Sequence, residues 1–159
     1  MKKKNQQKIR KEVRRMIQPD TIKLLRECDA GIKIGTSSIQ EVMPYVKNET
    51  FLQAMEECQK QHESLQQKID AMLADYQDEG KDPTPMAKGM SYMKTSVRLA
   101  MDESDETVAD LITDGCNMGV KSLSRYLNQY EAAEEKAKDI AKKLIHMEEK
   151  LAEDVRQFL

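Results

Sequence analysis

The stretch that decides the fold reads Cys28-Asp29-Ala30-Gly31-Ile32-Lys33-Ile34-Gly35-Thr36-Ser37-Ser38-Ile39. A similar pattern returns 84 positions later, with the matched pairs Gly31/Gly115, Gly35/Gly119, Ser38/Ser122 and Ile39/Leu123. Both copies place a Gly-x-x-x-Gly on one helical face, because residues four apart are neighbours on a helix surface. We interpret each copy as the first helix of a two-helix unit, so the chain is predicted to contain two such units in tandem.

The composition favours one helical domain. The chain has 159 residues, of which 39% are apolar and 4% aromatic, and it has no Trp. That length is sufficient for one core, and the few clustered Gly and Pro fit long helices with sharp breaks. No run approaches the ~20 apolar residues of a membrane span or the apolar stretch of a signal peptide. The odd count of three Cys argues against a secreted disulfide framework, so a bacterial, cytoplasmic protein is expected.

Charge divides the chain into a basic arm and an acidic remainder. Residues 1–18 hold eight basic and one acidic side chains, and the rest holds 18 basic and 27 acidic side chains. We predict an N-terminal arm over 1–18, flexible or a short amphipathic helix, stopped at Pro19, and a helical bundle over 19–159. A basic arm can bind nucleic acid or an anionic membrane surface through residues 2–17. Alternatively, the arm lies on an acidic surface of its own or a sister subunit.

Start signals and apolar periodicity define the helices of the bundle. After Pro19, Asp20 or Thr21 is expected to cap the first long helix, which ends near residue 43, and Asn48 to cap the second, over about 49–76. A shorter helix over about 86–101 lies in a long crossover. Ser104 is expected to cap the third long helix, and the turn into the fourth is expected near 128–132. The order is hairpin, long crossover, hairpin.

This organisation resembles the ferritin-like superfamily, and it is most similar to a branch of small bacterial proteins of unknown function built as two helical hairpins. The resemblance rests on the helix order, the Asp82-Pro83-Thr84-Pro85 turn, the crossover helix and the Ser104-Asp105-Glu106 start. It implies an all-α, ferritin-like four-helix bundle of two helical hairpins joined by a long crossover with a short extra helix. It also implies a homodimer paired through helix faces.

The chain lacks the Glu-x-x-His motifs that a di-iron site would need. Di-iron members use a carboxylate on the first helix of each pair and Glu-x-x-His on the second. Here the corresponding motifs are Gln59-x-x-His62 and Lys143-x-x-His146, an amide and a cation in place of Glu. There is also no nucleophile–base pattern and no phosphate-binding glycine loop. We therefore expect a structural or interaction protein that is not an enzyme, with pairs such as Glu148/Glu149 on solvated faces.

Two alternative functions remain: metal binding or redox chemistry, and binding of an anionic surface through the arm. The candidate ligands for a metal ion (iron, zinc or copper) are His62, Cys58, Cys28, Cys116 and Asp29. Against metal binding, buried Cys behaves as a small hydrophobe, and a lone His on an apolar stripe is commonly a hydrogen-bonded core residue. In that structural role, His62 is expected to bond to Thr36, Asp29 or Tyr126, and His62→Leu to be tolerated or stabilising. Most of the eleven Met are expected to fill gaps in the core.

Overall fold

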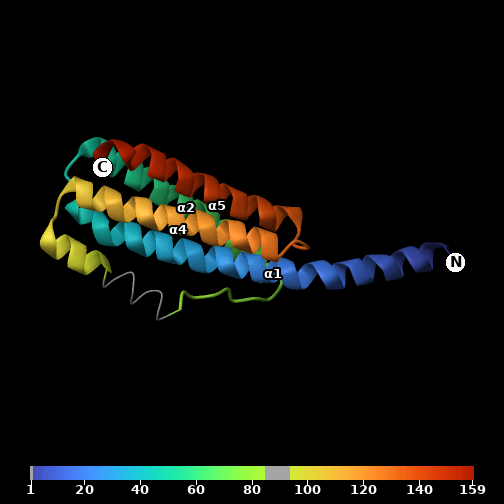
Figure 1. The fold of residues 1–159 in the computed structure, drawn as a ribbon. Coiled ribbons are helices and arrows are strands. Elements are labelled where there is room, and N and C mark those ends of the chain that lie inside the picture. The colour runs from blue at the N-terminus through green and yellow to red at the C-terminus, as the bar shows by residue number, and fades with distance from the viewer. Residues whose placement is uncertain (1, 85–93) are drawn as a thin grey trace.

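The computed structural model describes residues 2–84 and 94–159, without the side chains of 14–18. All regular secondary structure in these ranges is helical, which confirms the all-α prediction (Figure 1). The elements are α1 Lys2–Val42, η1 Met43–Tyr45, α2 Glu49–Asp75, α4 Asp105–Gln129, α5 Glu135–Val155 and η2 Arg156–Phe158. A further helical segment covers 94–101, and the expected start of this crossover helix lies outside the described residues.

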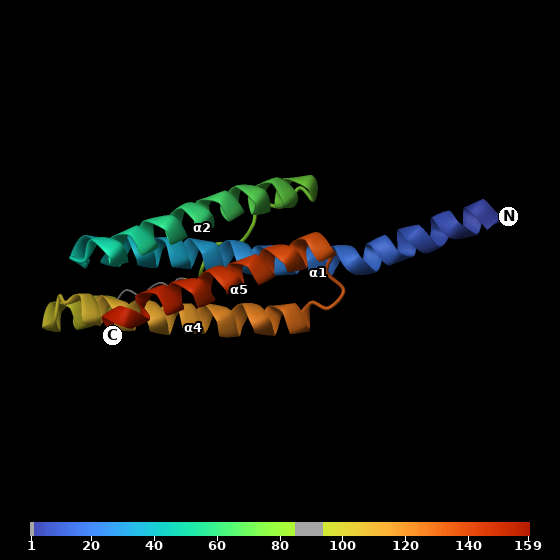
Figure 2. The ribbon, with the colours of Figure 1, turned by 90° about the horizontal axis from the view of Figure 1, so that it is seen from above.

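The four long helices lie side by side (Figures 1 and 2). The region in which they pack against one another is called the body. α1 and α2 form one antiparallel hairpin, and α4 and α5 form the other. Across the hairpins, α1 contacts α4 and α2 contacts α5. The described residues after α2, up to 84, lead back along the body, and α2 and α4 run in the same direction (Figure 1).

Local capping signals set two of the helix starts, as predicted. The side chain of Asn48 accepts a hydrogen bond from the Phe51 N–H, and that of Ser104 accepts one from the Thr107 N–H. Both satisfy amides that have no partner inside the helix. The Asp105 carboxylate also accepts the N–H groups of Lys47 and Asn48, at 2.7 and 3.0 Å, and this ties the two hairpins together at one end of the body.

The predicted helix break at Pro19 is wrong, because α1 runs through this residue. Proline costs a helix one hydrogen bond, but its fixed φ is itself helical. Asp20 and Thr21 therefore do not cap their own helix. Instead, Asp20 accepts the Ala132 N–H at 3.1 Å and Thr21 accepts the Glu134 N–H at 2.8 Å. These bonds join α1 to the loop that leads into α5, and they supply acceptors to amides near the start of that helix.

The core consists of two hydrophobic clusters, and each of the four long helices contributes to both. One includes Cys28, Ile32, Leu65, Ile69, Leu123, Leu144 and Met147. The other includes Ile39, Met55, Cys58, Ile112, Cys116, Leu151 and Val155. The expectation for methionine holds only in part among the described residues, since Met55 and Met147 are buried whereas Met101 and Met118 are 81% and 68% exposed.

Candidate functional site

A polar layer separates the two hydrophobic clusters, and each long helix contributes one residue to it. The layer consists of Gly35 on α1, His62 on α2, Gly119 on α4 and Glu148 on α5. On every helix, the preceding and following core residues belong to different clusters, as Cys58 and Leu65 do on either side of the histidine. The layer is therefore a level at which a charged pair crosses the centre of the body.

Both ring nitrogens of His62 face acceptors. Nε2 lies 3.1 Å from Oε1 of Glu148, and Nδ1 lies 2.9 Å from the carbonyl oxygen of Cys58, with the Cys58 Sγ at 3.4 Å. The histidine is 1% exposed and the Glu148 side chain 15% exposed. Two acceptors require two N–H donors, so this geometry favours the doubly protonated imidazolium. His62 and Glu148 thus form a largely buried ion pair.

The second glycine of each Gly-x-x-x-Gly lies against this pair, and at Gly35 the space is tight. A Cβ on Gly35 would lie 3.0 Å from the His62 Nε2, and a Cβ on Gly119 would lie 3.4 Å from the Cγ of Glu148. At the first glycines, Gly31 and Gly115, an added Cβ would meet nothing within 4 Å. The two glycines of the motif therefore differ: the first is spatially unconstrained in both copies, whereas the second contacts the layer, with too little space for a side chain at Gly35 and ordinary contact distance at Gly119.

We expect Gly35→Ala to lower the free energy of unfolding by about 1–2 kcal/mol, and Gly31→Ala to raise it by about 1 kcal/mol. Both changes give the helix the same propensity gain. At Gly35, however, the new methyl pushes on a ring whose two nitrogens are already held. Urea denaturation of both variants measures the difference, and equal stabilisation by both would show that the layer does not need the space.

The environment of His62 raises its pKa from the ordinary 6.5 to about 10. Burial lowers the pKa, but the hydrogen bonds with Cys58 and Glu148 and the carboxylate charge raise it by more. Burial also raises the pKa of Cys116, and the Glu148 charge adds to this effect. In the other cluster, burial raises the pKa of Cys28 to about 12. Thiols held neutral in this way are poor nucleophiles.

The raised pKa predicts a loss of stability at alkaline pH. Below pH 6.5, His62 carries its proton in both the folded and the unfolded chain, so the pair contributes fully. As the pH rises toward 10, the unfolded chain loses this proton first, and the free energy of unfolding falls by up to about 1.4 kcal/mol per pH unit. We expect wild type to show this slope between pH 6.5 and 8, below the thiol range, and His62→Gln to lack it. Parallel curves for the two proteins would contradict the assignment.

The five candidate metal ligands do not form one site. His62 lies in the polar layer and Cys58 and Cys116 border it, whereas Cys28 belongs to the other cluster and Asp29 to a separate network. Within residues 2–84 and 94–159, no three His, Cys, Asp or Glu side chains are grouped so that they could hold a metal ion. All three cysteines are buried and free. The partner of His62 is none of the three residues expected from the sequence.

Glu148 is the functional residue that sequence reasoning missed. The acidic pair predicts a solvated face for both of its members, and Glu149 is indeed exposed. Two signals could have identified Glu148. It follows the buried Met147, and it lies one turn before the buried Leu151 on the same helix. It therefore borders the apolar stripe of α5 at the level where the first helix of each hairpin carries glycine.

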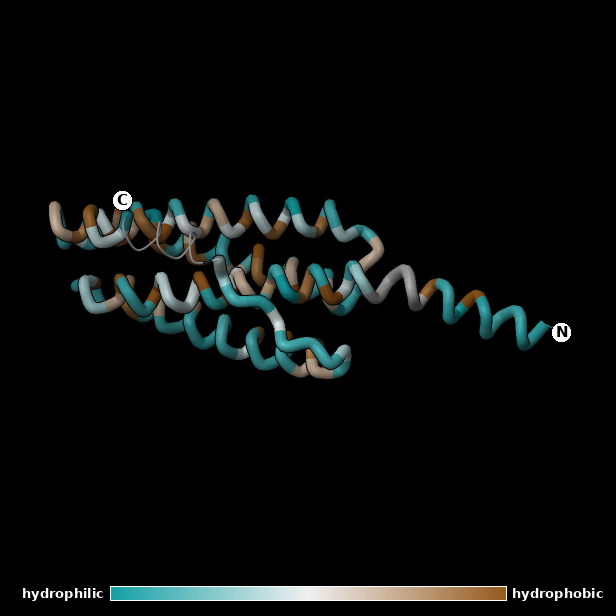
Figure 3. Tube along the Cα trace, turned by 90° about the horizontal axis from the view of Figure 1, so that it is seen from below, coloured by the Kyte–Doolittle hydropathy of each residue, from teal (hydrophilic) through white to brown (hydrophobic). Residues whose placement is uncertain are grey.

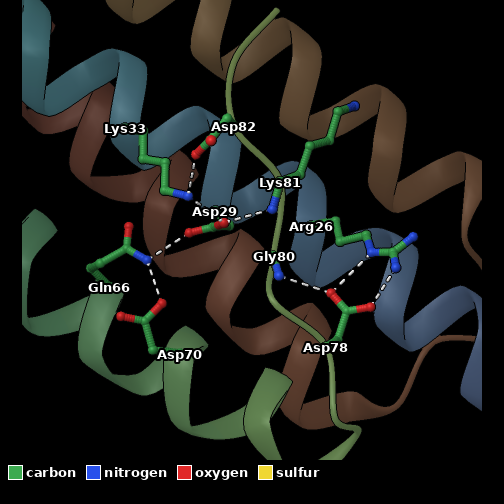
Figure 4. A network of polar contacts seen from close by, with 9 residues as sticks. All are labelled: Arg26, Asp29, Lys33, Gln66, Asp70, Asp78, Gly80, Lys81 and Asp82. Atoms are coloured by element: carbon green, nitrogen blue, oxygen red, sulfur yellow. Dashed lines mark hydrogen bonds and ion pairs between the residues drawn. The ribbon is translucent and has the colours of Figure 1, made fainter.

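Asp29 anchors the start of the crossover, and Figure 4 shows its contacts. It is 1% exposed, and its oxygens accept bonds from Gln66 Nε2 at 2.6 Å, Lys33 Nζ at 3.0 Å and the Lys81 N–H at 2.8 Å. Gly80 passes directly over it with φ +84°, and a Cβ there would lie 2.3 Å from Oδ2. The site has glycine because the backbone approaches the carboxylate so closely.

Further charge pairs hold residues 78–82, which we call the strap, against α1. Asp78 binds the Arg26 guanidinium through both of its oxygens and also accepts the Gly80 N–H (Figure 4). The Arg26 hydrogen bonds lower the pKa of Asp78. Lys81 Nζ reaches Glu27 at 2.7 Å, and Asp82 accepts from Lys33 at 2.8 Å. Asp29 is thus a structural carboxylate at the centre of an anchor, and its oxygens already have donors.

The N-terminal part of α1 is the second candidate site. Residues 2–13 extend past the body as helix, and every one of their side chains is exposed (Figures 1 and 2). We call this segment the extension. It carries six basic side chains and one acidic side chain. Ile9 and Val13, 55% and 46% exposed, lie four residues apart on it and so share one helical face. Figure 3 shows the extension as mostly hydrophilic with short hydrophobic stretches.

No protein-family model matches the chain, and no curated protein or solved structure matches it either. Among the described residues, no helix has the length and apolar character to cross a membrane. The structure itself defines the class: an all-α protein with a buried ion pair between its two core clusters and an exposed basic helical extension.

Proposed function

We propose that this is a non-catalytic interaction protein of ferritin-like build, which binds an anionic partner through its extension. The observation that carries the proposal is the exposed, basic, amphipathic helix beyond the body. An isolated helix of this length is marginal in water. A partner that covers Ile9 and Val13 and neutralises the lysines would stabilise it.

The ferritin-like assignment is supported by the helix order and by the direction of the chain through the crossover. A di-iron centre of that superfamily needs a carboxylate on the first helix of each pair and Glu-x-x-His on the second. In the polar layer the first helices contribute Gly35 and Gly119, and the second helices contribute an imidazole and a carboxylate that bind each other. This chain therefore gives no basis for ferroxidase or oxygenase chemistry, and elemental analysis of protein purified without chelator is expected to find no stoichiometric metal.

The test measures three associations of the full chain at low and high salt. They are self-association, binding to a DNA duplex, and binding to vesicles that contain an anionic phospholipid. We expect at least one of them to be detectable and salt-sensitive, because exposed charge interactions weaken as ions screen them. Neutralising Lys2, Lys3, Lys4 and Lys8 to Gln should weaken that association about ten-fold or more.

The matched control neutralises four exposed lysines of the body, Lys121, Lys136, Lys142 and Lys143. It changes the net charge equally but leaves the extension intact, so we expect it to retain most of the association. No association with any probe, or equal losses in both variants, would show that the extension is not the binding surface.

A further inference from the structure

An open cavity is lined by the last part of the crossover, the start of α4 and Leu159. The crossover enters α4 at the end of the body opposite the extension (Figure 1). Its volume is about 530 Å³. The residues that line it are Arg98, Met101, Asp102, Glu106, Thr107, Asp110 and Leu159. This cavity is complementary to the extension in two independent respects, charge and apolar exposure.

The cavity carries the opposite charge. Three carboxylates and one guanidinium line it, and the guanidinium of Arg98 is already paired with Asp110 at 2.7 Å. Hydrogen bonds from Ser104 and Thr107 lower the pKa of Asp102 below its ordinary value, so this carboxylate is charged at neutral pH. Glu106 is exposed at the rim. The lining therefore has a net charge of two negative units, against a strongly basic extension.

The cavity also exposes apolar side chains. Met101 is 81% exposed and Leu159 is 56% exposed. A methionine suits an adaptable contact, because its unbranched side chain fills irregular gaps. The extension offers the matching pair, Ile9 and Val13, on one helical face. Contact between these four side chains would remove apolar surface from water at both ends of the protein.

The extension cannot reach the cavity of its own chain. It is the part of α1 that projects away from the body (Figures 1 and 2), and α1 spans about 60 Å at 1.5 Å per residue. The cavity is lined by residues 98–110 and Leu159, at the other end of the body. Only another molecule can bring the two surfaces together.

We propose that the extension of each copy docks on the cavity of a second copy, in an antiparallel dimer with two-fold symmetry. The proposal rests on the function proposed above, and it names the partner as this same chain. Two copies that lie side by side in opposite directions place each extension near the cavity end of the other. Both contacts then form at once, which closes the assembly as an isologous dimer.

Sedimentation velocity of the full chain tests the proposal. We expect wild type to be a dimer at low salt and to dissociate as salt is added. The double variant Lys3→Glu/Arg10→Glu reverses two cations that lie two turns apart on one side of the extension. We expect it to weaken dimerisation about ten-fold or more. Circular dichroism melts check that the body remains folded.

A charge swap provides the decisive step. Adding Glu103→Lys and Glu106→Lys to the double variant places two cations at and beside the cavity, to face the two new anions of the extension. Dimerisation is then expected to return. The matched control adds Glu56→Lys and Glu63→Lys, two exposed positions on α2, and is expected not to restore it. Restoration by the control alone, by both or by neither would overturn the proposal.

The probes of the previous section separate the two proposals. A wild-type chain that is monomeric but binds DNA or vesicles through its extension would show the dimer to be wrong and leave the interaction function standing. A chain that is monomeric and binds neither probe would contradict both proposals.

Discussion

Replacing His62 with leucine is expected to lower the free energy of unfolding by about 3–5 kcal/mol, because it leaves the Glu148 carboxylate without its cation. The carboxylate is 15% exposed, so little water reaches it to replace the lost cation. The Cys58 carbonyl oxygen loses a donor in the same variant. Urea denaturation at neutral pH measures the effect. This prediction reverses the expectation from the sequence, which treated the histidine without its partner.

The double variant His62→Leu/Glu148→Met is the control. It removes both charges together, and replacing a buried ion pair by apolar side chains of similar volume is often neutral or stabilising. We therefore expect it to recover most of the stability lost in the single variant. If the effects of His62→Leu and Glu148→Met simply add, the two residues are not coupled and the polar layer is incorrectly assigned.

Replacing Asp29 with alanine is expected to lower the free energy of unfolding by about 3 kcal/mol, the second largest effect. The change removes a buried carboxylate that binds two side chains and the backbone of the strap. Lys33 keeps a second acceptor, Asp82, but the amide of Lys81 loses its partner. Limited trypsin digestion should then cut after Lys81 faster than in wild type.

Asp70→Ala is the matched control for the strap. Asp70 shares the Gln66 amide with Asp29, at 2.7 Å, but it lies on the exposed face of α2. We expect it to change stability by less than about 0.5 kcal/mol and to leave the cleavage rate unchanged. Equal rates of cleavage in Asp29→Ala and wild type would show that the strap is held by its outer ion pairs alone.

Local signals in the sequence predicted most of the fold. Asn48 and Ser104 cap their helices because a short side chain can reach amides two or three residues ahead, and this needs no information from the rest of the chain. The break predicted at Pro19 was wrong because contacts distant in sequence act there. Its missing N–H removes only one bond, and contacts from Asp20 and Thr21 to the loop before α5 help hold α1 in place. Those contacts cross more than 110 residues of sequence.

The candidate site was less predictable because its partners are distant in sequence. The histidine was identified from its place on the α2 stripe, but Glu148 lies 86 residues away. No spacing rule pairs two such residues until the register between α2 and α5 is known. The same limit applies to the predicted metal ligands Cys28, Cys58, Cys116 and His62, because the register between helices decides which of them come together. Helix packing places Cys28 in the cluster on the far side of the layer from Cys58 and Cys116.

The polar layer also restricts how the four helices can slide past one another. Apolar stripes alone tolerate a shift of one helical turn, about 5.4 Å, because leucine and isoleucine exchange places with little change in contact. Such a shift would move Glu148 opposite apolar side chains and leave the imidazolium without an anion. A single polar residue in an otherwise apolar helix interface can fix the register in this way. The ion pair would then specify one register between the two hairpins and destabilise packings that are shifted by a helical turn.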